Sequence, residues 1–171
     1  MIYNVNIERL ELFCVFDLKG SRTDIASRLV KLRIVPPEIP NTAAIVGNVA
    51  LCWVGQKHWI LRAPQSEAGA LISGFQTNDI KEENISIVEV SDMLQFFSIS
   101  GVDATNVLAV CCALDTHSTV FPHNAVTFTE MFGTKALVLR DALPDSEGFQ
   151  IAVDRSYADF IDDNLHRILG T

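Results

Sequence analysis

The stretch from residue 88 to residue 122 constrains the fold most, because a strand, a tight corner and a helix follow one another there. Residues 94–100 are predicted to form a strand, since their phenylalanine and isoleucine side chains favour extended backbone. Gly101 is the corner, and residues 103–112 are predicted to form a helix. Asp103 is expected at the N-cap, where a carboxylate suits the helix dipole and accepts free N–H groups. Such a succession is generic, whereas the acidic, histidine-bearing loop that follows it and ends at Phe121-Pro122 is less so.

Short apolar segments separated by turn residues predict further strands and helices along the rest of the chain. The other predicted strands, two hairpins among them, are residues 10–18, 44–54, 57–63, 85–90, 125–132, 136–141 and 149–153. The first hairpin is expected to turn at Gly55-Gln56 with type II′ geometry. The other predicted helices are residues 21–32, residues 66–75 with Ser66 as N-cap, and a final helix after Ser156 with apolar residues at helical spacing. Residues 35–41, rich in proline, are predicted to be a stiff connector.

These elements indicate an α+β fold in which each helix covers one face of a mostly antiparallel sheet. The two halves of the chain echo each other, which favours two ferredoxin-like α/β units sharing mostly antiparallel sheets. We expect them to be lobes of a single domain, at about residues 1–92 and 93–171. The identity between the halves is too low to establish a sequence repeat.

The overall charge disfavours two classes of partner. The net charge is −8 and the isoelectric point is about 4.8, so phosphate backbones and anionic membrane surfaces are repelled. The first residues lack the basic region of a signal peptide, and no segment is apolar for the length of a membrane span. These features predict a soluble cytoplasmic protein that binds neither nucleic acid nor membrane.

Hydrophobic residues make up 49% of the chain, which is high beside 20% charged residues. The excess indicates either a well-filled core or an apolar surface that a partner covers. The four cysteines, Cys14, Cys52, Cys111 and Cys112, form no C-x-x-C pair and are predicted to be free, buried thiols. The histidines do not supply the ligand spacing of a zinc site.

No nucleotide-binding, hydrolase or metalloprotease motif is present in the sequence. We therefore predict no catalytic, cofactor-binding or metal-binding residue. Some polar and aromatic residues are still candidates for structural or partner contacts, and they are Asp17, Lys19, Trp53, Trp59, Asp115, His117, Phe121 and Arg155. Asp115 and His117 can pair as acid and imidazole, but no nucleophile accompanies them. Fixing a long loop is the simpler role for that pair, and core packing is the simpler role for the two tryptophans.

Several short motifs occur in an order that is similar to one known family. They are Phe16-Asp17-Leu18-Lys19-Gly20, Pro40-Asn41, Leu51-Cys52-Trp53-Val54-Gly55 with Trp59-Ile60-Leu61, Val90-Ser91-Asp92, Ile99-Ser100-Gly101, Leu114-Asp115-x-His117 with Phe121-Pro122, and Arg155-Ser156-Tyr157-Ala158. The set covers nearly the whole chain and resembles the gamma subunit of heterotetrameric sarcosine oxidase. The chain departs from the family pattern at the Gly55-Gln56-Lys57-His58 turn and in residues 126–130.

The resemblance implies a non-catalytic structural subunit without activity of its own. It implies a complex of alpha, beta, gamma and delta subunits that oxidises sarcosine to glycine and passes the one-carbon unit to tetrahydrofolate. FAD, FMN, NAD and tetrahydrofolate are then expected on the partner subunits, and none on this chain. The implied fold is similar to part of the folate-binding aminomethyltransferase domain. We also expect self-association when the chain is expressed alone.

Two alternatives stay open at this point. One is the related gamma subunit of N-methylglutamate dehydrogenase. The other is a stand-alone folate or pterin binder of the aminomethyltransferase kind, with Trp53 and Trp59 as a stacking wall and Asp17 or Asp115 as the acid that contacts the pterin ring.

Overall fold

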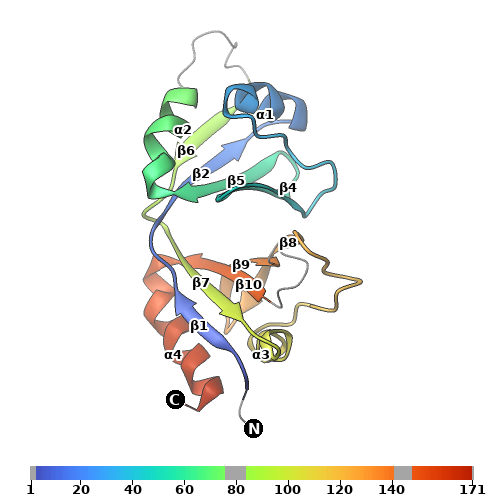
Figure 1. The fold of residues 1–171 in the computed structure, drawn as a ribbon, viewed down its shortest axis with the longest axis vertical. Helices are drawn as coiled ribbons and strands as arrows, with labels where there is room; N and C mark the ends of the chain where they lie inside the picture. The colour runs from blue at the N-terminus through green and yellow to red at the C-terminus, as the bar shows by residue number, and fades with distance from the viewer. Residues whose placement is uncertain (1–2, 76–83, 141–147, 171) are drawn as a thin grey trace. The chain divides into compact units, whose positions relative to one another are not determined.

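The computed structural model describes residues 3–75, 84–140 and 148–170. The chain forms two compact units, which we treat separately (Figure 1). The continuous unit is Leu12–Ser91, and the split unit combines Met1–Glu11 with Asp92–Thr171. Each unit contains one five-stranded sheet in which all pairs of neighbouring strands are antiparallel.

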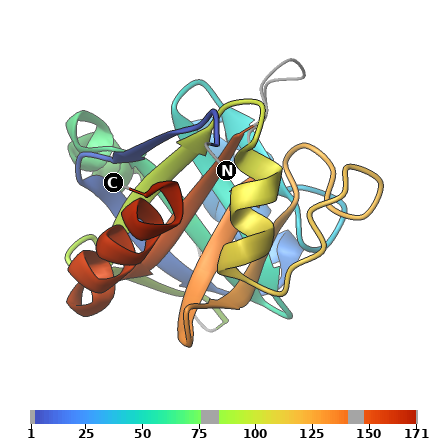
Figure 2. The same cartoon turned by 90° about the horizontal axis from the view of Figure 1, so that it is seen from below.

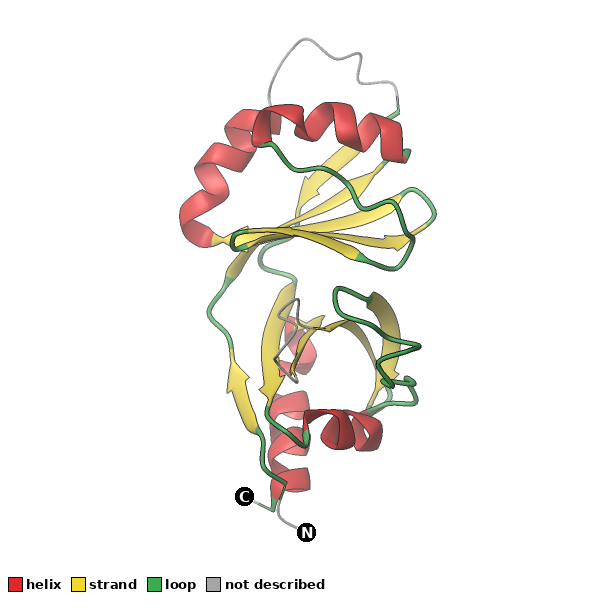
Figure 3. Cartoon of the chain, turned by 45° about the vertical axis from the view of Figure 1, so that its right-hand side comes forward, coloured by secondary structure: helices red, strands yellow, loops and turns green. Residues whose placement is uncertain are grey.

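The continuous unit carries its two α-helices on one face of the sheet (Figure 3). Its elements in chain order are β2 (Phe13–Lys19), α1 (Arg22–Leu29), the 3₁₀ turn η1 (Val30–Leu32), β3 (Ala43–Val46), β4 (Val49–Gly55), β5 (His58–Pro64), η2 (Gln65–Glu67), α2 (Ala68–Phe75) and β6 (Ser86–Glu89). The strand order is β3-β4-β5-β2-β6. Ser21 and Asp24 form a capping box that starts α1, because each side chain bonds the other residue's backbone N–H.

The split unit has the same architecture, with α3 and α4 side by side on one face of its sheet (Figure 2). Its elements are β1 (Asn6–Arg9), β7 (Leu94–Ser100), α3 (Ala104–Cys111), β8 (Val126–Met131), β9 (Thr134–Arg140), β10 (Gly148–Asp154), η3 (Arg155–Tyr157) and α4 (Ala158–Leu169). The strand order is β1-β7-β10-β9-β8.

The two units match element by element. Strand β2 pairs with β5 from Phe13↔Pro64 to Lys19↔His58, and β7 pairs with β10 from Leu94↔Asp154 to Ser100↔Gly148. In both units a glycine follows the first of these strands, and a 3₁₀ turn joins the second strand to its helix. Each unit is a βαββαβ ferredoxin-like fold with one added edge strand, β3 or β8. The predicted fold class is therefore confirmed, with a separate sheet in each unit.

The fourth strand of the split unit comes from the other end of the chain. Strand β1 pairs with β7 at Asn6↔Ser100 through Arg9↔Phe97, in the place that β6 takes beside β2. Residues 1–11 therefore belong to the split unit, whereas the predicted lobe boundary put them with residues up to 92. Strand β1 was not predicted, because this four-residue edge strand has only one apolar residue, Ile7.

Three predicted boundaries are wrong for local reasons. The predicted strand 44–54 is two strands, β3 and β4, which are separated by a turn at Gly47, where φ is 57°. The β4–β5 turn lies at residues 56–57 instead of Gly55-Gln56, and Lys57 takes the positive φ of 57°. Ser66, the predicted N-cap, lies inside η2, because a 3₁₀ turn precedes this helix.

Asp103 stands at the N-cap of α3 as predicted, but its side chain does not cap the helix. Its Oδ2 accepts a hydrogen bond of 2.8 Å from the backbone N–H of Asn4. Its Oδ1 accepts a bond from Nδ2 of Asn106. The carboxylate therefore ties the segment before β1 to the corner after β7.

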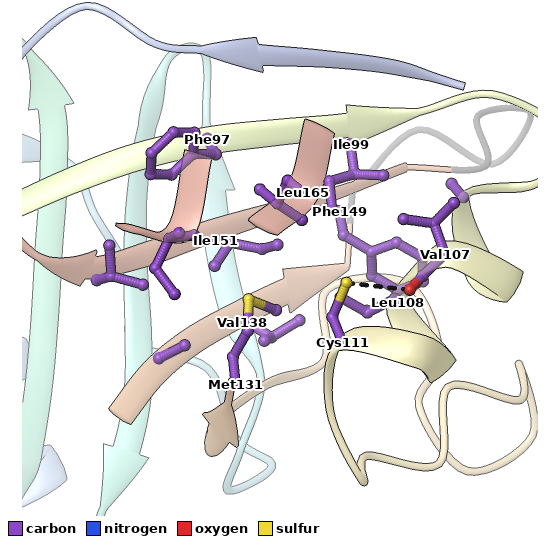
Figure 4. Close-up of a cluster of buried hydrophobic side chains, with 14 of the residues drawn as sticks. Phe97, Ile99, Val107, Leu108, Cys111, Met131, Val138, Phe149, Ile151 and Leu165 are labelled. Atoms are coloured by element: carbon purple, nitrogen blue, oxygen red, sulfur yellow. Dashed lines mark hydrogen bonds between the residues drawn. The ribbon is translucent and has the colours of Figure 1, made fainter. Parts of the chain in front are cut away.

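Each unit has its own apolar core between sheet and helices. In the split unit, side chains from β7, β9 and β10 meet those of α3 and α4 (Figure 4). Its buried members include Phe97, Ile99, Val107, Leu108, Val138, Phe149, Ile151 and Leu165. In the continuous unit, Trp59 and Leu61 of β5 pack with Ile25 and Leu29 of α1 and with Leu71 of α2. Each fully buried side chain of this size contributes roughly 1.5–3 kcal/mol.

Candidate functional site

The loop 114–122 connects α3 to β8 and is ordered by hydrogen bonds from its own side chains. Asp115 Oδ1 accepts the N–H of His117 at 3.0 Å, and His117 Nδ1 lies 2.8 Å from Thr119 Oγ1. The carbonyl of His117 accepts the N–H groups of Val120 and Phe121. Asp115 and His117 are both exposed. The predicted acid–histidine pair is therefore a turn-forming pair in which the carboxylate bonds the backbone of His117 and not its ring.

Arg140, at the end of β9, braces this loop from inside the split unit. The side chain is 3% exposed, and its Nη1 donates to the carbonyl oxygens of Thr116 at 2.8 Å and Phe121 at 3.1 Å. The guanidinium also lies 5.4 Å from the centre of the Phe149 ring. Phe121 is 5% exposed and joins the core of the split unit. Arg140 was not predicted as a structural residue, because only the fold brings β9 beneath the loop.

Asp17 and Lys19 lie on β2 with a third polar residue, His58 of β5. His58 Nε2 is 2.8 Å from Asp17 Oδ1, and Lys19 Nζ is 4.0 Å from Asp17 Oδ2. Strand pairing explains the cluster, because His58 is directly opposite Lys19 in the antiparallel register. Asp17 is half-buried and Lys19 is exposed. The cluster can orient polar groups at this strand end, but it has no nucleophile.

Trp53 and Trp59 stack on each other across the β4–β5 pair. Their ring centroids are 4.7 Å apart with an interplanar angle of 20°. Trp59 is fully buried and donates its Nε1–H to the carbonyl of Gly20, while Trp53 donates to the carbonyl of Gly55. Because Trp59 has no exposed surface, it cannot stack on a pterin. The stacking wall of the folate-binder alternative is therefore wrong, and core packing accounts for the pair.

The equivalence of the units relates this tryptophan pair to Arg140. Trp59 pairs with Leu18 as Phe149 pairs with Ile99, so Trp59 and Phe149 are equivalent. Trp53 is opposite Trp59, and Arg140 is opposite Phe149. The split unit thus has Arg140 where the continuous unit has the stacked ring of Trp53. The guanidinium of Arg140 supplies the hydrogen-bond donors for the loop 114–122.

Arg155 opens η3 and is tied to the start of β7. Its backbone N–H donates to the carbonyl of Met93 at 2.9 Å, and its Nη1 lies 3.9 Å from Asp92 Oδ1. Asp92 is almost fully exposed, so this ion pair contributes little. The carboxylate of Asp154 accepts from the N–H and hydroxyl of Ser156, and these two bonds lower the pKa of Asp154.

The four cysteines are free, as predicted; Cys14, Cys52 and Cys111 are buried, whereas Cys112 is only half-buried. Burial raises the pKa of Cys52 to about 12 and that of Cys111 to about 12. Burial likewise raises the pKa of Cys14 and Cys112. Cys111 Sγ donates to the carbonyl of Val107, one turn back in α3 (Figure 4). These thiols are packing groups and not nucleophiles.

The predicted positions therefore form separate groups within the two units. Asp115, His117 and Phe121 share one loop of the split unit, Asp17 and Lys19 join His58 in the continuous unit, and the tryptophans pair with each other. Within residues 3–75, 84–140 and 148–170, no group of three His, Cys, Asp or Glu side chains is placed to hold a metal ion. No helix in those ranges is long and apolar enough to cross a membrane. A shallow depression lies on the β8–β9 hairpin, where Lys135 Nζ covers the Phe128 ring at 4.0 Å.

Residues 24–167 match the model of a protein family described as "Sarcosine oxidase, gamma subunit family". No curated protein matches the sequence. Among solved structures, heterotetrameric sarcosine oxidase from Corynebacterium sp. U-96 is similar, with a TM-score of 0.77 and 16% identity over 96% of this chain and 85% of that one. The glycine cleavage system aminomethyltransferase T from Bartonella henselae is also similar, with a TM-score of 0.67 and 12% identity. This chain is covered to 96% in that match but spans only 46% of the aminomethyltransferase. At these identities the two structures establish the fold.

Proposed function

Because the chain belongs to the sarcosine oxidase gamma subunit family, we propose that it is a non-catalytic structural subunit of a heterotetrameric sarcosine oxidase. The family match over residues 24–167 carries this proposal. The candidate residues support it, since Asp115 bonds the backbone of His117, Asp17 contacts His58, and Arg140 bonds the carbonyl of Thr116.

We propose that the alpha, beta and delta subunits are its partners and that they carry FAD, FMN, NAD and tetrahydrofolate. The similarity to an aminomethyltransferase fold supports a role beside a folate-binding domain, since a chain of the same fold offers a matching shape. This chain then contributes contact area and shape to the complex. The amine oxidised by the complex is sarcosine in this proposal.

In the split unit, the loop 114–122 is our candidate contact with a partner subunit. Asp115 and His117 are exposed and fixed by short hydrogen bonds, and Val120 is 62% exposed beside them. A loop ordered in the free subunit loses little entropy on binding. Asp17, Lys19 and Arg155 are further candidate contacts, whereas Phe121 and Trp59 act from the core.

Co-expression tests this proposal. The other subunits are purified with and without this chain, and the flavin content and the turnover of sarcosine are compared. We expect complexes without the chain to be unstable or poorly loaded, and the chain alone to be colourless and inactive. Full assembly, normal flavin content and full turnover in its absence would contradict the proposal.

A further inference from the structure

The most exposed apolar side chains of the continuous unit lie close together in sequence, at and after the end of α1. Val30, Val35 and Ile39 are 68%, 71% and 66% exposed. In the rest of that unit, as far as the structure describes it, no large hydrophobic side chain is more than 52% exposed. Exposed apolar side chains on one short segment are typical of a protein–protein contact.

The backbone that displays these side chains is fixed, although it belongs to no sheet. We call residues 35–41 the proline connector. Arg22 Nε donates to the carbonyl of Pro37 at 2.9 Å, and its Nη2 donates to the carbonyl of Pro36 at 3.1 Å. Ile34 and Pro36 are buried, so the exposed Val35 between them points outward. Prolines cannot donate to a sheet, and a rigid segment loses little entropy when a partner covers it.

The charge of this surface is opposite to that of the chain as a whole. In residues 30–41 the charged side chains are Lys31, Arg33 and Glu38, all exposed, so this segment carries a net charge of +1 (two basic, one acidic) where the chain carries −8. Lys31 and Arg33 are exposed between Val30 and Val35. A matching partner face therefore combines apolar side chains with carboxylates, because complementary charge steers association and fixes orientation.

The proline connector occupies the same place in its unit as the loop 114–122 does in the split unit. Each joins the first helix of a ferredoxin-like unit to its added edge strand. Each is braced by an arginine that donates to two backbone carbonyls, Arg22 in one and Arg140 in the other. The two arginines come from different elements, α1 and β9, so the shared arrangement is not a simple copy of one sequence. Rigid display of exposed apolar residues is therefore a property of both connectors.

We propose that the proline connector, with Val30, Lys31 and Arg33, is a docking surface for another subunit of the complex, whose contact face combines apolar side chains with carboxylates. This inference rests on the proposed function and adds to it a named surface and the chemistry of the partner.

Co-purification with affinity-tagged partner subunits tests the inference. The Val35→Asp/Ile39→Asp variant replaces two exposed apolar side chains with carboxylates. We expect this variant to lower the amount of bound chain at least about tenfold. The Lys31→Glu/Arg33→Glu variant replaces two exposed basic side chains with acidic ones. We expect the resulting loss of bound chain to be larger at low salt than at high salt. The control, Val46→Asp/Val88→Asp, changes two exposed valines of the same unit and should stay within about twofold of the wild type.

Thermal unfolding of each isolated variant checks its fold, and the Lys31/Arg33 variant changes only exposed side chains, so it tests the surface even if the first variant is unstable. If the wild-type chain binds and both variants bind equally well, the docking surface is refuted while the subunit function stands. If the wild-type chain does not bind, the proposed function fails and this inference fails with it. If the variants abolish only self-association of the isolated chain, the occupant is a second copy and the inference is refuted.

Discussion

Phe121 shows how one residue can fix a loop at both its side chain and its backbone. The ring is buried in the core of the split unit, its N–H donates to His117, and its carbonyl accepts from Arg140. The neighbouring Val120 and Pro122 are exposed. The residue therefore anchors a segment that is otherwise on the surface.

Phe121→Ala is expected to lower the free energy of unfolding by about 3–5 kcal/mol, because it leaves a cavity in a packed core. Urea unfolding of the isolated chain measures the change. Val120→Ala, at the exposed neighbour, is the matched control and should cost less than about 0.5 kcal/mol. A loss below about 1 kcal/mol for Phe121→Ala would place the ring on the surface.

Arg140→Leu is expected to cost about 2–3 kcal/mol, because it removes the charged donor of two carbonyl oxygens. Arg9→Leu is the control, since Arg9 pairs with Asp159, whose side chain is 91% exposed. Exposed ion pairs contribute at most about 1 kcal/mol. Equal losses in urea unfolding would show that Arg140 does not brace the loop.

The buried thiols predict a resistance to alkylation. Their raised pKa keeps Cys52 and Cys111 protonated at neutral pH, with thiolate forming only near pH 12. Their contribution to stability is full below the ordinary thiol pKa of 9.0 and is lost as the pH rises through about 12, because the unfolded chain releases these protons more easily. Mass spectrometry after iodoacetamide treatment at pH 8 should find these two residues unmodified in the native protein and modified in urea. Fast native labelling would contradict their burial.

At the scale of elements, the corner after β7 depends on a glycine. Gly101 has a φ of 128°, and a Cβ there would lie 2.5 Å from the carbonyl oxygen of Asn4. The segment that leads into β1 can therefore approach this corner closely only because Gly101 has no side chain. In the continuous unit, Gly20 takes the equivalent place after β2.

Gly101→Ala is expected to destabilise the protein and to raise the rate of amide hydrogen exchange in β1. The added Cβ would collide with the backbone of Asn4, which cannot move aside as easily as the end of a side chain could. Gly133→Ala is the control: its φ is also positive, at 81°, but no atom lies within 4 Å of the added Cβ. The difference between the two variants isolates the contact with Asn4. If both variants exchange alike in β1, then the corner does not hold that strand.

Elements were predictable where hydrophobic pattern and packing agree. Strand β7 has the predicted bounds, and α4 has the predicted apolar spacing, with Ile161 and Leu165 buried. Strand β1 was not predictable, because its pairing depends on a partner about ninety residues away and not on its own apolar content. The braces from Arg22 and Arg140 were missed for the same reason, since both act on carbonyl groups that leave no trace in the side-chain pattern.

For the whole molecule, two equivalent units carry equivalent connectors, and both connectors display apolar side chains. Val35 and Ile39 in one unit and Val120 in the other are each more than 60% exposed. In an isolated chain these apolar side chains are exposed to water, whereas in a complex a partner subunit can cover them.

We therefore expect the isolated chain to self-associate in the micromolar range and to become a single copy per complex when co-expressed with its partners. Sedimentation velocity measures both states. The Val35→Asp/Ile39→Asp variant should weaken the self-association, and the Val46→Asp/Val88→Asp variant should not. A strictly monomeric isolated chain at every concentration would argue that these surfaces are not adhesive.

The origin of β1 also sets an order of events during translation. The ribosome makes β1 first, then every strand of the continuous unit, and only afterwards the β7 to which β1 binds. The continuous unit can therefore fold while β1 is still unpaired, and the split unit folds last.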